Sequence, residues 1–142
     1  MSKRQETVDA LAACLSGLTA ANGYVTDLKT VREDNGTALT ADEMPACLIR
    51  DKISKIDRKD YLERKTRILV KFIFADSEDI RSRMRTALSE AYRIIGSDEV
   101  LGGEVGLLTP VSDKLMIETE TNKIGTATIK FSAAYETTLW ED

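Results

Sequence analysis

Hydrophobic and polar residues alternate along the segment Tyr61–Ala75, which is the longest regular pattern in the chain. A period of two over this length is typical of a β-strand with one buried face, and a helix rarely produces it. The face predicted to be buried carries Leu62, Thr66, Ile68, Val70, Phe72 and Phe74. The opposite face is mainly charged, with Leu69 and Ile73 as interruptions. We therefore expect a long strand with one side in the core.

Two segments show the apolar spacing of amphipathic helices. They are predicted at Lys3–Ala20, which Asn22-Gly23 ends, and at Ser77–Ile95, which Asp76-Ser77 can cap. Their apolar stripes are Val8, Leu11, Ala12, Leu15 and Leu18 in the first helix, and Ile80, Met84, Ala87, Leu88, Ala91 and Ile95 in the second. Each helix is expected to bury its stripe against a sheet.

Five further strands are predicted, at Tyr24–Leu28 with Val31 as a further candidate member, and at Met44–Ile49, Glu104–Thr109, Lys114–Thr121 and Thr126–Leu139. Pro110 is expected to stop the third of these, because proline donates no backbone hydrogen bond. Between the second and the long strand, Lys52–Asp60 is either a polar loop or an extended hairpin arm. The order α-β-β-β-α-β-β-β predicts an α+β fold, with a mixed, mainly antiparallel sheet and two helices packed on one face. The other face is expected to meet solvent or a neighbour.

The chain has 142 residues and a net charge of −4, which predicts a single domain and argues against a general nucleic-acid binder. The charge is unevenly distributed. Arg50–Lys71 contains nine basic and four acidic residues, so this segment carries +5 and the remainder carries −9. Such a split favours head-to-tail contacts between unlike surfaces.

Histidine is absent, which excludes serine–histidine triads and histidine-based zinc sites. Carboxylate pairs remain as candidates, namely Asp57 with Asp60 and Glu118 with Glu120, although a solvated strand face explains them better. The glycine-rich segment 102–106 lacks the phosphate-loop spacing and indicates a turn. We expect no enzymatic activity and no cofactor or metal.

The two cysteines, Cys14 and Cys47, lie in apolar patterns without a metal-binding spacing. Both are expected to act as small core residues in a reducing, cytoplasmic setting. No apolar run approaches the ~20 residues of a membrane span, so no membrane partner is expected.

A basic stretch, Arg50–Arg67, is the most distinctive charged region. It is either a solvated arm or an arm that pairs with an acidic neighbour. Under the second interpretation a subunit or tube interface includes Arg50, Lys52, Lys55, Arg58 and Lys59. Trp140 is either a lid on the core or an interface anchor. The arginines of the second helix face solvent, contact another protein or, in a DNA-binding module, contact phosphates.

The chain resembles the tail terminator (tail completion) proteins of long-tailed bacteriophages, the lambda-type minor tail protein group. The resemblance spans nearly the whole chain and is carried by Thr19-Ala20-Ala21-Asn22-Gly23-Tyr24 with Thr26-Asp27, by Met44-Pro45-Ala46, by the long strand that leads into Asp76–Ile95, and by the last strand with Phe131 and Tyr135. The order and lengths of the elements contribute most of it, and the basic stretch matches no family motif.

The resemblance implies an α+β protein that assembles as a ring, commonly hexameric, on the end of the tail tube. Such a ring stops tube polymerisation and offers a surface for head–tail joining. The implied partners are copies of the chain, the tail tube protein and the head–tail connector protein, in the virion tail. Alternatives are a connector component, a tube subunit or a DNA-binding module, and no specific nucleic acid is expected.

Overall fold

The structure is a computed structural model that describes residues 2–58, 62–75, 77–97, 107–118 and 124–137. Its helices and strands are α1 (Lys3–Leu15), β1 (Thr30–Glu33), β2 (Ala46–Arg58), β3 (Leu62–Ala75), α2 (Ile80–Ser97), β4 (Leu107–Glu118) and β5 (Ile124–Thr137). The sheet order is β1-β2-β3-β5-β4, with β1 parallel to β2 and the other neighbours antiparallel. The protein therefore has the predicted α+β fold with a mixed, mainly antiparallel sheet.

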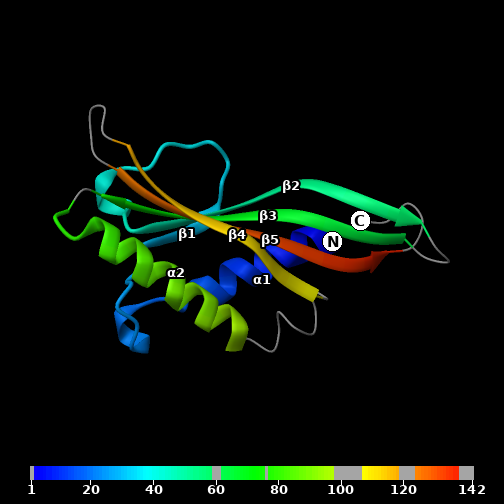
Figure 1. The fold of residues 1–142 in the computed structure, drawn as a ribbon, viewed down its shortest axis with the longest axis horizontal. Helices are drawn as coiled ribbons and strands as arrows, with labels where there is room; N and C mark the ends of the chain where they lie inside the picture. Colours follow the sequence, from blue (N-terminus) through cyan, green and yellow to red (C-terminus); the bar gives the residue numbers. More distant parts are fainter. Residues whose placement is uncertain (1, 59–61, 76, 98–106, 119–123, 138–142) are drawn as a thin grey trace.

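Both helices lie against the same face of the sheet, and β2, β3 and β5 extend beyond α1 (Figure 1). We call this the inner face. The core between helices and sheet combines the stripes of α1 and α2 with alternate strand residues, among them Leu11, Leu15, Met84, Ala91, Ile49, Val70, Phe72, Ile129 and Phe131. No described helix covers the opposite face, which we call the outer face.

The alternation in β3 is confirmed, since all six residues of the predicted apolar side are buried. β3 occupies the centre of the sheet and pairs with β2 on one side and β5 on the other. Its polar member, Thr66, is satisfied by hydroxyl groups, because its Oγ1 lies 2.8 Å from Tyr135 Oη and 3.1 Å from Ser54 Oγ. Burying a hydroxyl is tolerated when such partners are present.

The segment after α1 differs from the prediction. α1 ends at Leu15 and not at Ala20, and residues 20–22 form a short 3-10 helix that Gly23 closes with a φ of 87°. The strand predicted to begin at Tyr24 forms later, as β1 (Thr30–Glu33), which contains Val31. Tyr24–Leu28 itself is irregular, and the N–H groups of Val25 and Thr26 are bound by a side chain of α2. The alternation there reflects burial of Thr26 and Leu28 in an irregular segment.

The region after α2 also differs. Pro110 does not stop a strand, and one continuous strand, β4, replaces the two predicted at Glu104–Thr109 and Lys114–Thr121. β4 lies at the edge of the sheet, and its register shifts between Pro110 and Ser112. An edge strand with a bulge accommodates proline, since the missing donor is not needed by a second neighbour.

β2 extends to Arg58, so Lys52 to Arg58 forms the extended hairpin arm and not a loop. α2 begins three residues later than predicted and continues through Gly96. Asp76, half of the predicted cap, lies outside the described residues. No helix in the described part of the chain is long and apolar enough to cross a membrane.

Candidate functional site: the basic face of the sheet

Eight basic residues lie on the outer face of the sheet. They are Arg50, Lys52 and Lys55 of β2, Lys65, Arg67 and Lys71 of β3, Lys114 of β4 and Lys130 of β5. We call this set the basic face. The pairing of the strands brings its members together: Thr128 of β5 is flanked by Lys71 on β3 and Lys114 on β4. Four strands thus contribute to one positively charged surface.

One hollow in the basic face has a cavity volume of about 270 Å³. Leu48, Leu69 and Met116 supply its apolar surface. Thr126 and Thr128 contribute hydroxyl groups, and Asp34 contributes a carboxylate. Four cations of the basic face line the same hollow: Arg50, Lys52, Lys71 and Lys114. An apolar floor beneath several positive charges suits a partner that offers both apolar and acidic side chains.

A second hollow, of about 330 Å³, lies along the hairpin arm between β2, β3 and β5. Lys55 and Lys65 stand directly opposite each other in its wall, which places like charges on adjacent strands. Such a pair destabilises a sheet unless an anion lies nearby. Ile53, which is 68% exposed, lines the same hollow. An exposed isoleucine among lysines is typical of a contact surface.

The positive charge of this face is largely unpaired among the residues that the structure describes. Among the described residues, Lys65 alone of the eight forms an ion pair, with 3.9 Å between its Nζ and Glu63 Oε1. Three arginines elsewhere do form ion pairs with described residues, namely Arg4, Arg32 and Arg93, and Arg4 Nε lies 2.8 Å from Asp51 Oδ2. The basic face therefore presents an electrostatic potential that attracts anionic groups.

The predicted interface residues are only partly brought together. Arg50, Lys52 and Lys55 belong to the basic face. Arg58 does not, because it pairs with Leu62, whose buried side chain marks the inner side of the sheet. Lys59 and Trp140 lie outside the described residues.

Sequence reasoning missed Lys114 and Lys130 as members of this site. Alternation along Thr126–Leu139 does place Lys130 on the side of that strand opposite its apolar residues. What could not be read was that β5 lies between β3 and β4, because strand order depends on the tertiary fold.

The candidate reactive groups do not form a centre in the part of the chain that the structure describes. Asp60 and Glu120, each half of a predicted carboxylate pair, lie outside that part. The described residues contain no group of three or more histidine, cysteine, aspartate or glutamate side chains placed to hold a metal ion. Cys14 and Cys47 are both buried, and burial raises the pKa of the Cys47 thiol.

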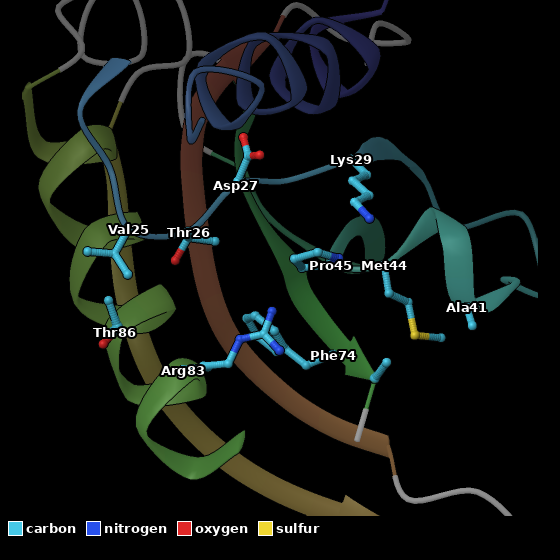
Figure 2. A pocket seen from close by; sticks show the side chains of 11 residues that line it. Val25, Thr26, Asp27, Lys29, Ala41, Met44, Pro45, Phe74, Arg83 and Thr86 are labelled. Atoms are coloured by element: carbon cyan, nitrogen blue, oxygen red, sulfur yellow. The ribbon is translucent and has the colours of Figure 1, made fainter. Parts of the chain in front are cut away.

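A separate pocket of about 420 Å³ opens on the helical side, beside α2 (Figure 2). We call it the α2 pocket, and it is lined by Val25, Thr26, Asp27, Lys29, Ala41, Met44, Pro45, Phe74, Ala75, Arg83 and Thr86. Arg83 lies over the ring of Phe74, with 5.2 Å between its guanidinium carbon and the ring centroid. Three parts of the chain meet here: the irregular segment before β1, the entrance of β2, and α2 with the end of β3.

Glu90 holds one wall of the α2 pocket in place. Glu90 is only 6% exposed, and its carboxylate accepts hydrogen bonds of 2.8 Å from the N–H groups of both Val25 and Thr26. Burial raises the pKa of Glu90, but hydrogen bonds from Thr26 and Val25, together with Arg93, outweigh burial and lower it. Sequence reasoning overlooked this residue, although its position three residues after Ala87 places it beside the apolar stripe of α2.

No protein-family model matches the chain, and no curated protein is significantly similar to it in sequence.

Proposed function

We propose that the protein is a structural component of a bacteriophage tail. In this proposal, copies of the chain form a closed hexameric ring on the head-proximal end of the tail tube. The ring stops the tube from growing and offers a surface to the head–tail connector protein. It assembles in the cytoplasm of the bacterial host and stays in the virion tail.

The observation that carries this proposal is the basic face. Seven of its eight cations have no ion-pair partner among the described residues, and one hollow in it has an apolar floor. A surface of this kind is stabilised when an acidic, partly apolar surface covers it. The chain carries such acidity itself, because its net charge outside Arg50–Lys71 is −9.

Contact between unlike patches on identical subunits is heterologous, so it generates a ring when the rotation between neighbours closes. No described helix covers the outer face of the sheet, which can therefore take part in such a contact, and the hairpin arm extends the surface beyond α1 (Figure 1). These features support a subunit whose function is assembly.

Charge reversal tests the proposal. We expect the wild-type chain to form closed rings in negative-stain images and a matching mass in light scattering across a concentration series. Lys71→Glu with Lys114→Glu should leave the protein monomeric, since both residues line the same hollow. The matched control is Arg81→Glu with Arg85→Glu, which makes the same charge change on the exposed side of α2.

Two results would contradict the proposal. If the Lys71/Lys114 variant still formed rings, the basic face would not be needed for assembly. A wild-type chain that stays monomeric at its highest soluble concentration would argue against self-assembly altogether. Long filaments would favour the alternative of a tail tube subunit over a terminator.

A DNA-binding module is the second candidate, favoured by the same cluster of cations. It predicts binding that falls steeply with salt concentration and is lost in the Lys71/Lys114 variant. The described aromatic residues Phe72, Phe74 and Phe131 face the core, so they offer no stacking platform on the basic face. The arginine-rich helix is weakened as a DNA site, because Arg93 lies over Tyr24 and near Glu90.

A further inference from the structure

The α2 pocket combines two cations with an apolar wall. Lys29 and Arg83 line it and form no ion pair with any described residue. Asp27, the acidic residue in the lining, offsets one of these two positive charges, and its Oδ1 accepts a hydrogen bond of 3.0 Å from Ala20 N. Met44, Pro45 and Phe74 provide the apolar wall (Figure 2). The pocket therefore suits a ligand with an aromatic or aliphatic part next to negative charge.

The pocket is held open before any ligand arrives. Glu90 pins Val25 and Thr26 through two backbone hydrogen bonds, and Lys29 N donates to Pro45 O at 2.9 Å. These contacts join the walls contributed by α2, the segment before β1 and the entrance of β2. A preorganised site loses less conformational entropy on binding.

We propose that the α2 pocket of one subunit binds the segment Leu139-Trp140-Glu141-Asp142 of a second copy of the chain. This inference rests on the proposed ring, for which it names a subunit contact. Trp140 and Leu139 supply the apolar part, and Glu141 and Asp142 supply two negative charges for Lys29 and Arg83. Tryptophan in a fitted pocket is a common energetic anchor of interfaces.

Geometry requires the segment to come from another copy. β5 ends at Thr137, which pairs with Leu62 at the start of β3, whereas the pocket lies at Phe74, 12 residues further along β3. Twelve strand residues span about 40 Å. The five residues 138–142 reach at most about 18 Å when fully extended. A subunit therefore cannot fill its own α2 pocket, but it can fill that of a neighbour. Repetition of this head-to-tail contact generates a ring when the rotation between neighbours closes.

Tryptophan fluorescence tests the contact, because Trp140 is the only tryptophan in the chain. Full-length protein carrying Trp140→Phe is titrated into a peptide of residues 136–142, and the emission of the peptide is followed. We expect saturable binding with a blue shift. Lys29→Glu should weaken binding at least about tenfold, which corresponds to ~1.4 kcal/mol. Arg81→Glu, outside the pocket lining, is the matched control and should leave the affinity unchanged.

A reciprocal change guards against misfolding of the pocket variant. A peptide in which Glu141 and Asp142 are both replaced by lysine should bind the Lys29→Glu, Arg83→Glu protein better than it binds the protein that carries Trp140→Phe alone. Failure of the natural peptide to bind, or equal binding to the Lys29→Glu protein, would overturn the inference.

Ring formation by the same variants distinguishes the two proposals. Rings formed by a protein that does not bind the peptide would refute the pocket contact but not the proposed ring. Saturable peptide binding by a chain that never forms rings would support the contact and refute the ring.

Discussion

The carboxylate of Glu90 links α2 to a segment 64 residues earlier in the chain. Replacing it with glutamine keeps the size of the side chain but removes its charge and one acceptor oxygen, so either Val25 or Thr26 loses its partner. We expect Glu90→Gln to lower the free energy of unfolding by about 1–3 kcal/mol, measured by urea denaturation. Glu33→Gln is the control on an exposed strand position, with an expected change below about 0.5 kcal/mol.

The same residue gives stability a defined pH dependence. Because the pKa of Glu90 is lowered in the folded protein, its ionised form is favoured by folding. This contribution is fully present above the ordinary value of 4.5 and is lost as pH falls through the lower value of the folded state. The stability difference between the wild type and Glu90→Gln should therefore narrow on acidification. A difference that does not change with pH would contradict this account.

At the scale of elements, the contact between α2 and β5 depends on the absence of a side chain at Gly125. A Cβ built there would lie 2.6 Å from Ile80 Cδ1 and 2.7 Å from Met84 Sδ, both of α2. We expect Gly125→Ala to push α2 from the sheet and to cost about 1–3 kcal/mol of stability in thermal or urea unfolding.

Gly96 provides the matched control for this substitution. It lies within α2, and a Cβ there would meet no atom within 4 Å. Alanine is the better helix former, so Gly96→Ala should be neutral or stabilising by up to about 1 kcal/mol. Equal destabilisation by both substitutions would show that loss of glycine, and not the approach of α2 to β5, is responsible.

The hairpin arm, formed by the end of β2 and the start of β3, exposes apolar side chains. Ile53 and Ile56 of β2 are 68% and 54% exposed. A partner protein could bury these exposed isoleucines. Lys55 and Lys65, on the outer side of the arm, favour a partner with acidic side chains.

At the scale of the whole molecule, assembly through unlike charges should depend on ionic strength. The Debye length falls from about 10 Å at 0.1 M salt to about 3 Å at 1 M, which screens exposed charge pairs. We expect the protein concentration at half-assembly to rise with sodium chloride, measured by analytical ultracentrifugation. A midpoint that falls as salt is added would indicate that apolar contacts, and not the basic face, drive the association.

Several features of the molecule could be predicted from the sequence because they are local. The buried side of β3 and the stripe of α2 follow from periodicity, which is set by backbone geometry whatever the partner element is. The errors also have local causes. Pro110 would stop a strand only if both edges of that strand were paired. The alternation around Thr26 suggested a strand because alternate burial in an irregular segment gives the same pattern.

The amino-acid sequence by itself determined the class of fold, the two helices, the central strand and the uneven charge. Only the tertiary structure decided that β5 lies between β3 and β4, and that Lys71 and Lys114 therefore line one hollow. It also showed that Lys52 to Arg58 belongs to a strand, and alternation in that strand places Arg58 on the other side of the sheet from Lys55. The physical reason is that periodicity states which side of a strand a residue occupies, whereas neighbouring strands are chosen by packing between residues distant in the sequence.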